Sequence, residues 1–186
     1  GGKAFVSGAD ISKFEDERAT LDAIAEYNAS VDRFSTALLS GIKPSIALIR
    51  GFCLGGGVGI AVFCDLRVAN DTARFAVPAA KLGLGYGYEN VRRIVDLVGP
   101  PFATEMLLTA RQFDAAEAAR AGLIHRVVPA AAIDRTAHEL AETIAGNAPL
   151  TIQAVKRLLR ELRGRSPRAP HAGAPVRDGV GGARCG

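Results

Sequence analysis

The chain has 186 residues, of which 48% are hydrophobic, and its formal net charge is +4. This length suits one domain with a substantial core, and no apolar run reaches the roughly 18–20 residues that a membrane span needs. Much of the arginine lies toward the C-terminal end without interleaved aromatic residues, so the positive charge does not indicate nucleic-acid binding. Three cysteines do not make a disulfide framework, and no Cys/His spacing matches a zinc site. We expect a cytoplasmic protein with buried thiols and with no metal, membrane or nucleic-acid partner.

The N-terminal part of the chain predicts a short strand and then a helix. Within residues 3–14, an apolar strand end leads into Gly8 and a short polar turn. Residues 14–39 carry apolar side chains at about 3.6-residue spacing with charged residues between them, which predicts a helix. Gly41 is the expected stop, and Pro44 prevents continuation. Because the chain begins with glycine inside a motif, we expect a fragment whose sheet lacks its opening strands.

Residues 44–65 form the most informative stretch. An apolar run at residues 44–49 predicts a strand, and residues 60–63 predict a buried helix. Between them, Gly55, Gly56 and Gly57 form a turn in which the backbone can approach a ligand closely. The first N–H groups of a helix lack intrahelical partners and lie at the positive end of its dipole. The turn suits phosphate, carboxylate or a carbonyl oxygen that gains charge during a reaction, and close helix packing is the alternative.

The remaining elements are predicted from spacing and from turn residues. Residues 78–90 are expected to be irregular, Gly99 and Pro100 break a helix, and Asp114 caps another. The expected strands are 65–69, 74–76 and 123–128, and the expected helices are 89–98, 101–109, 114–121, 133–145 and 150–162. We divide the chain into a core at residues 1–129, a C-terminal helical region at 130–163 and a disordered tail at 164–186, which is rich in Gly, Pro, Ala and Arg.

Several of these segments, in this order, resemble the crotonase (enoyl-CoA hydratase/isomerase) superfamily. The resemblance covers about residues 1–163. It rests on Phe5-Val-Ser-Gly-Ala-Asp-Ile11, Lys43-Pro44, Gly51-Phe-Cys-Leu-Gly-Gly-Gly57, Cys64-Asp65, Phe75-Ala-Val-Pro78, Leu82-Gly83, Leu107-Leu-Thr109, Ala115 to Ala118 and Ala121-Gly-Leu123.

The resemblance implies an α/β fold, a crotonase-type spiral of repeated ββα units with a helical C-terminal region. It implies an enzyme of lyase or isomerase type in fatty acid metabolism that binds an acyl-CoA thioester. Coenzyme A arrives as part of the substrate, with no separate cofactor. Family members assemble as trimers or pairs of trimers, so a homotrimer or hexamer is expected for the full-length protein.

The resemblance also implies an oxyanion hole, in which two backbone N–H groups stabilise the oxygen of a thioester enolate. The two donors correspond to the N–H groups of Ala9 and Gly56, and Gly57 is the neighbour most easily confused with Gly56. One such donor is worth about 2.7–4 kcal/mol in kcat. The substrate-binding positions are Ser7, Gly8, Ala9, Asp10, Ile11, Leu54, Gly55, Gly56, Gly57, Pro78 and Leu82.

The chain departs from the family pattern where hydratases carry their two catalytic glutamates. Those positions are Gly59 and Ala79, and neither residue can donate or accept a proton. Water addition to an enoyl thioester uses paired carboxylates. Standard hydratase activity is therefore not expected, and isomerases that rely on the second glutamate are disfavoured by the same alanine.

Tyr86 and Glu89 are the candidate replacements. Tyr86 corresponds to a tyrosine of the methylmalonyl-type acyl-CoA decarboxylases, although their companion histidine would fall at Ala9. Glu89 is ionisable, but an exposed acid in the first turn of a helix is the alternative. The function is thus enolate stabilisation in an acyl-CoA enzyme, and the alternatives are a decarboxylase-like enzyme that uses Tyr86 or a non-catalytic truncated pseudoenzyme. A dinucleotide-binding domain is excluded because the glycine spacing is wrong.

Three further polar residues receive structural interpretations. His125 lies in an apolar link and is expected to be a satisfied structural histidine. Asp65 is expected to fix the start of a strand or to pair with a basic residue. Lys156 and its basic neighbours are expected to form a solvated helix face, although they could also reach CoA phosphates.

Overall fold

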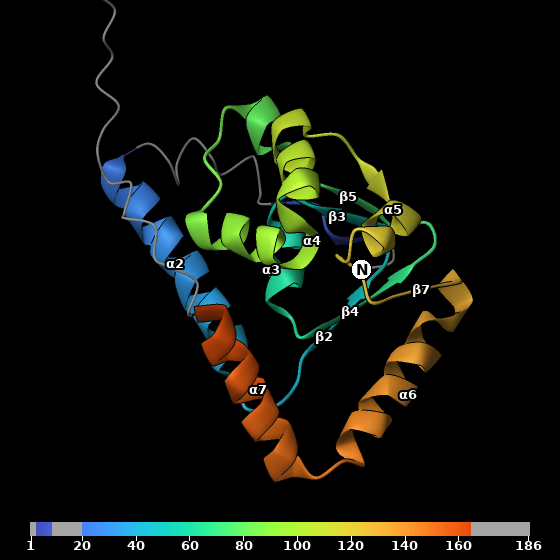
Figure 1. Ribbon diagram of the computed structural model, residues 1–186. Helices are drawn as coiled ribbons and strands as arrows, with labels where there is room; N and C mark the ends of the chain where they lie inside the picture. The colour runs from blue at the N-terminus through green and yellow to red at the C-terminus, as the bar shows by residue number, and fades with distance from the viewer. Residues whose placement is uncertain (1–2, 9–19, 165–186) are drawn as a thin grey trace, which may run out of the picture.

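The computed structural model describes residues 3–8 and 20–164. The predicted tail lies outside these ranges except for Gly164, which is the last residue of a helix and not disordered. The elements follow one another in the order drawn in Figure 1. They are β1 (Ala4–Val6), α2 (Leu21–Ser40), β2 (Ile46–Ile49), β3 (Phe52–Leu54), α3 (Gly56–Phe63), β4 (Leu66–Asn70), β5 (Arg74–Ala76), the 3₁₀ helix η2 (Pro78–Leu82), α4 (Tyr88–Thr109), β6 (Phe113–Asp114), α5 (Ala115–Arg120), β7 (Arg126–Val128), the 3₁₀ helix η3 (Ala130–Ala132), α6 (Ile133–Ala145) and α7 (Pro149–Gly164).

The strands form two sheets, and the strands from β1 to β5 alternate between them. One sheet has the order β1-β3-β5-β6, in which only β6 is antiparallel to its neighbour, and the other is the parallel sheet β2-β4-β7. The chain thus passes from β2 to β3 and then into α3, and from β4 to β5 and then through η2 into α4. Two successive ββα units result, each contributing one strand to each sheet. This repetition is the predicted spiral arrangement.

The sequence predicts most of these elements, and it misses two short strands of the larger sheet. β3 has three residues and lies between β1 and β5, and β6 has two residues. Neither is long enough to show an alternating pattern, so their strand conformation depends on their neighbours. Helix α2 begins after the N-cap Thr20 within the described part, and the earlier residues of the predicted helix lie outside it.

Helix α3 is buried because its residues are small or apolar and it contacts α2, α4, β1 and β3. A methyl group built on Gly57 would lie 2.4 Å from the Val6 carbonyl oxygen in β1. No Cβ fits at that distance, so glycine is what lets the first turn of α3 lie directly against β1. Close helix packing, the alternative interpretation of the glycine triplet, is therefore present at Gly57.

The C-terminal end of α3 is held by two buried arginines, each with 2% of its surface exposed. Arg67 in β4 donates from Nε to the Leu123 carbonyl at 2.6 Å and from a terminal nitrogen to the Cys64 carbonyl at 2.7 Å. Arg93 in α4 donates to the Val62 carbonyl at 3.1 Å. Burial lowers the pKa of Arg67 to about 10, so it stays protonated at neutral pH. Cations at this end complement the helix dipole and satisfy carbonyls that lack intrahelical partners.

Two further boundaries follow the sequence prediction. Helix α4 bends at Gly99, whose φ of 74° is not helical, immediately before Pro100 and Pro101. Asp114 caps α5, because its side chain accepts the Glu117 N–H while the Glu117 side chain accepts the Asp114 N–H. This reciprocal pair is a capping box.

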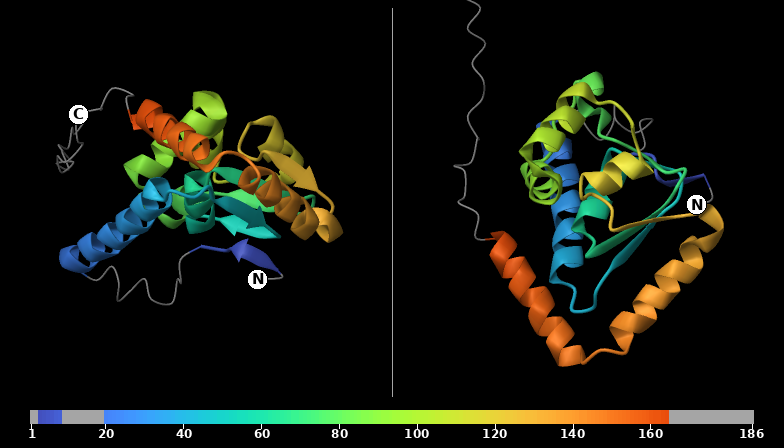
Figure 2. Two further views of the ribbon diagram at one scale, coloured as in Figure 1. Left: turned by 90° about the horizontal axis from the view of Figure 1, so that it is seen from below. Right: turned by 45° about the vertical axis from the view of Figure 1, so that its right-hand side comes forward.

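Helices α6 and α7 form two arms of a V (Figures 1 and 2), and α6 contacts β2 and β4. In α7, the Lys156 ammonium lies 2.7 Å from the Asp65 carboxylate and 2.7 Å from the Lys43 carbonyl oxygen. Its side chain is only 11% exposed. The prediction of a solvated basic face is therefore wrong for Lys156, because it is used to attach α7 to the start of β4. Arg157 does keep an exposed position, with 74% of its side chain exposed.

Asp65 accepts the Lys156 hydrogen bond that attaches α7. It also accepts from the backbone N–H and the hydroxyl of Ser45, at 2.8 and 3.0 Å, which confirms that it fixes the start of a strand and pairs with a base. Burial by itself would raise the pKa of Asp65, but the bonds from Lys156 and Ser45 outweigh it and lower that pKa below the ordinary 3.8.

Within the described residues, no helix is both long and apolar enough to span a bilayer.

We predict that Gly57→Ala destabilises the fold, because the added methyl group would overlap the Val6 carbonyl. Overpacking of this kind costs about 1–3 kcal/mol. The measurement is the free energy of unfolding from urea titration. Gly85→Ala is the matched control, since nothing lies within 4 Å of a methyl group at Gly85. Equal stabilities for the two variants would contradict the packing account of Gly57.

We predict that Lys156→Met loosens α7 while leaving the sheets folded. The change leaves Asp65 without its cation, a loss of about 1–3 kcal/mol, so amide exchange in α7 should accelerate roughly tenfold or more. Hydrogen exchange resolved by mass spectrometry measures this. Arg157→Met removes a cation from the same helix whose partner, Glu161, also lies in α7. If both variants exchanged alike, the attachment through Lys156 would be refuted.

The same carboxylate gives a prediction for acid pH. Because the folded pKa of Asp65 is lowered, its stabilisation is present above its ordinary pKa of 3.8 and is lost as the pH falls through the lower folded value. The stability difference between wild type and Asp65→Asn should therefore shrink as the pH is lowered from about 5 to about 2. Urea titrations across this range check it, and a constant difference would count against the charged interaction.

Candidate functional site

The N-terminus of α3 is where the segments singled out by the sequence meet. A methyl group built on Gly55 would lie 3.9 Å from the Gly8 Cα and 3.7 Å from the Pro78 Cδ. The turn after β1, the turn before α3 and the start of η2 are therefore neighbours. Ala9, Asp10 and Ile11 lie outside the described residues, so the donor role of the Ala9 N–H stays a prediction.

The three consecutive glycines have different environments. Gly55 has a φ of 51°, which favours glycine, and its N–H donates to the Ala76 carbonyl at 2.8 Å. Gly57 is buried against β1. Gly56, the first residue of α3, is exposed, and the N–H of a first helical residue has no partner within the helix. Gly56 is thus the member of the triplet that a ligand can reach.

Tyr86 reaches this turn from the loop before α4. Its hydroxyl donates to the Gly55 carbonyl at 3.2 Å, and the residue is half-buried. Burial raises the pKa of Tyr86, so it is a neutral phenol at physiological pH. The hydrogen bond fixes the ring beside the glycine turn.

Two uncharged polar groups pack closely against Gly59. A methyl group on Gly59 would lie 3.4 Å from the Tyr86 hydroxyl oxygen and 3.1 Å from the Asn90 Oδ1. Asn90, in the first turn of α4, was not identified from the sequence. Its only signal there is a polar side chain four residues after Tyr86, at the start of a helix. Ala79 in η2 packs against the hydrophobic core and provides no acid.

Glu89 does not share this environment. Its carboxylate pairs with Arg92 at 3.2 Å, one turn along the same helix, and 53% of its side chain is exposed. This supports the exposed first-turn interpretation, and a catalytic role for Glu89 stays a prediction.

The other predicted binding positions differ in exposure, and their role in binding stays a prediction. Ser7 is exposed after β1, Leu54 is half-buried at the end of β3, and Pro78 begins η2. Leu82, at the end of η2, is 51% exposed.

His125 and the two buried cysteines have structural environments. The His125 Nδ1 accepts a hydrogen bond from the backbone N–H of Arg67 at 3.2 Å, which confirms a satisfied histidine. The backbone N–H of His125 donates to the Arg67 carbonyl at 3.1 Å. Cys53 and Cys64 are buried free thiols, and burial raises the pKa of Cys53 to about 12. Among the described residues, no three His, Cys, Asp or Glu side chains are grouped closely enough to hold a metal ion.

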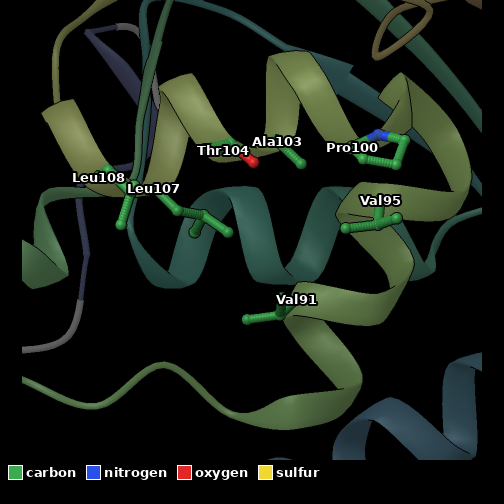
Figure 3. Close-up of a pocket in the computed structure, with 7 residues that line it drawn as sticks. All are labelled: Val91, Val95, Pro100, Ala103, Thr104, Leu107 and Leu108. Atoms are coloured by element: carbon green, nitrogen blue, oxygen red, sulfur yellow. The ribbon is translucent and has the colours of Figure 1, made fainter.

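An apolar pocket of about 240 Å³ lies on the concave side of the bent helix α4 (Figure 3). It is lined by Val91, Val95, Pro100, Ala103, Thr104, Leu107 and Leu108. Val91 and Val95 come from the arm before Gly99, and the other lining residues follow the bend. No residue of the predicted site lines this pocket.

Comparisons with known proteins cover most of the chain. The family model described as enoyl-CoA hydratase/isomerase matches residues 1–171. The short-chain-enoyl-CoA hydratase of Clostridium acetobutylicum is 37% identical over 159 residues, which are 86% of this chain and 60% of that protein. The carnitinyl-CoA dehydratase of Citrobacter koseri is 37% identical over 164 residues, with coverages of 84% and 62%. The chain thus spans about three fifths of the length of these relatives.

Solved structures agree with the spiral of ββα units. An enoyl-CoA hydratase/carnitine racemase from Magnetospirillum magneticum superposes with a TM-score of 0.85 at 34% identity, covering 91% of this chain and 64% of that one. A putative enoyl-CoA hydratase/isomerase family protein from Hyphomonas neptunium gives 0.84 at 39% identity, with coverages of 91% and 65%. The α/β architecture is therefore the crotonase fold, and the chain belongs to the enoyl-CoA hydratase/isomerase family.

Proposed function

We propose that this protein binds an acyl-CoA thioester and stabilises its enolate at the N-terminus of α3. The observation that carries the proposal is the meeting of two glycine-bearing turns, with Gly8 and Gly55 as neighbours and the exposed Gly56 next in the chain. Relatives named as enoyl-CoA hydratase and carnitinyl-CoA dehydratase support the substrate class. Coenzyme A enters as part of the substrate, and the full-length protein is proposed to assemble as a homotrimer or hexamer.

In this proposal the helix supplies the electrostatic stabilisation. Formation of an enolate moves negative charge onto the thioester oxygen, and the Gly56 N–H and the positive end of the α3 dipole face that charge. The Ala9 N–H is the proposed second donor. Because β1 and the two buried arginines fix α3 at both ends, its N–H groups need little reorganisation as the charge develops.

Proton transfer needs an acid or base, and the described residues beside Gly59 offer no carboxylate of the kind that hydratases use. The positions of the two family glutamates are Gly59 and Ala79, and the groups beside Gly59 are a phenol and a carboxamide. We therefore do not propose the two-carboxylate hydration mechanism. Tyr86 favours a second candidate, decarboxylation, because a hydrogen-bonded phenol borders the space where hydratases carry their first glutamate.

The prediction for this function concerns which thioester reacts. Methylmalonyl-CoA or ethylmalonyl-CoA should lose CO2, while crotonyl-CoA should be hydrated slowly. Tyr86→Phe should lower kcat for CO2 release about tenfold or more, which corresponds to about 1.4 kcal/mol. Released CO2 and the absorbance of the enoyl thioester are the two measurements.

Tyr88→Phe is the matched control, because Tyr88 is 58% exposed and should not affect turnover. Thermal unfolding of both variants verifies that they fold. Rapid hydration of crotonyl-CoA would refute the account of the missing acids. Binding of thioesters without any turnover would identify a non-catalytic pseudoenzyme, and failure to bind any CoA thioester would overturn the proposed function.

A further inference from the structure

We infer that His125 is a pH-sensitive clasp, which ties the start of β7 to β4 while its imidazole is neutral and opens when the imidazole takes up a proton. The histidine has no part in the proposed thioester chemistry, so the inference goes beyond the proposed function and does not depend on it. Its basis is the pair of hydrogen bonds that join His125 to the backbone of Arg67.

The two bonds lie at the end of the ladder between β4 and β7. The paired residues of this ladder begin with Val68 and Arg126, and Arg67 and His125 immediately precede them. The backbone N–H of His125 donates to the Arg67 carbonyl at 3.1 Å. The Arg67 N–H in turn donates to the imidazole Nδ1 at 3.2 Å. A titratable side chain therefore accepts the amide hydrogen at the point where the ladder ends.

The bond from the Arg67 N–H requires a neutral imidazole. Nδ1 accepts a hydrogen bond only when it carries no proton, and in the imidazolium both ring nitrogens are donors. Two N–H groups would then face each other across 3.2 Å, so the charged ring has to turn away. His125 lies at the surface, although the bonded side of its ring is partly buried. The ring can therefore take up a proton and rotate without opening the core.

The charges around His125 favour the open state in acid. Arg67 in β4 and Arg163 in the last turn of α7 act on the imidazole, and both are cations. On α5, which contacts β7, Glu117 is engaged in a capping box and Arg120 is a further cation. Partial burial and the two cations Arg67 and Arg163 lower the pKa of His125 below the ordinary 6.5. The stabilisation is thus present above pH 6.5 and is lost as the pH falls through the lower folded value.

Arg67 connects the clasp to α3. Its guanidinium donates to the Leu123 carbonyl at 2.6 Å, two residues before His125, and to the Cys64 carbonyl at 2.7 Å, at the end of α3. The link before β7 and the end of α3 therefore share one arginine. When the clasp opens, the link gains freedom and the Leu123 carbonyl holds the guanidinium less firmly. Acid should therefore loosen the last turn of α3 as well as the start of β7.

The experiment is amide hydrogen exchange, resolved by NMR spectroscopy and corrected for the intrinsic effect of pH. Between about pH 7.5 and about pH 5, the protection factor of the Arg67 amide should fall about tenfold or more, because the amide loses its acceptor. The Cys64 amide, which donates to the Ala61 carbonyl at 3.2 Å at the end of α3, should lose protection to a smaller extent.

Two substitutions at one position separate the hydrogen bond from the proton. His125→Asn offers an amide oxygen that can accept from the Arg67 N–H but does not titrate, so protection of that amide should be equal at both pH values. His125→Ala removes the acceptor and should leave the Arg67 amide weakly protected at both. His138→Asn is the matched control, because His138 is 74% exposed and pairs with Glu142 in the same helix.

The outcomes decide the matter as follows. A loss of protection in the wild type and in His138→Asn that is absent from His125→Asn supports the clasp. An Arg67 amide that keeps its protection in acid in the wild type overturns it, and so does an equal loss in the wild type and His125→Asn. If His125→Ala does not fold, the comparison of the wild type with His125→Asn is sufficient. Thioester binding enters none of these measurements, so the proposed function is tested separately.

Discussion

Helix α3 is the element on which the rest of the structure depends, because it is fixed at both ends. At its start, Gly57 allows the backbone to contact the Val6 carbonyl in β1. At its end, Arg67 and Arg93 bond the Cys64 and Val62 carbonyls from β4 and α4. The helix therefore contacts both sheets and α4. These contacts hold the exposed Gly56 at the start of α3 in place, which is the kind of preorganisation that electrostatic catalysis requires.

The polarity of the site follows from what surrounds that helix. Relatives are named for hydration and dehydration of CoA thioesters, yet the space beside Gly59 is bordered by Tyr86 and Asn90. Fold and chemistry are separable in this way because the fold supplies the backbone donors, whereas proton transfer depends on a few side chains. An uncharged environment with a fixed phenol tolerates an anionic acyl group better than a pair of carboxylates does.

The sequence by itself determined the elements whose signals are local. The break of the helix at Gly99, the cap of α5 by Asp114, and the end of α2 at Gly41 were all predicted from neighbouring residues. The glycine turn before α3 was also recognisable. Caps, turns and helical periodicity depend on residues a few positions apart, so one sequence is sufficient to identify them.

Only the tertiary structure decided the features that join distant residues. β3 is a strand because β1 and β5 flank it. Lys156 attaches α7 because the fold brings it to Asp65, which is 91 positions away in the sequence. Asn90 likewise lies beside Gly59 because α4 packs against α3, although the two residues are 31 positions apart in the sequence. No local pattern encodes such contacts, since their energy arises only when the folded chain brings the two partners together.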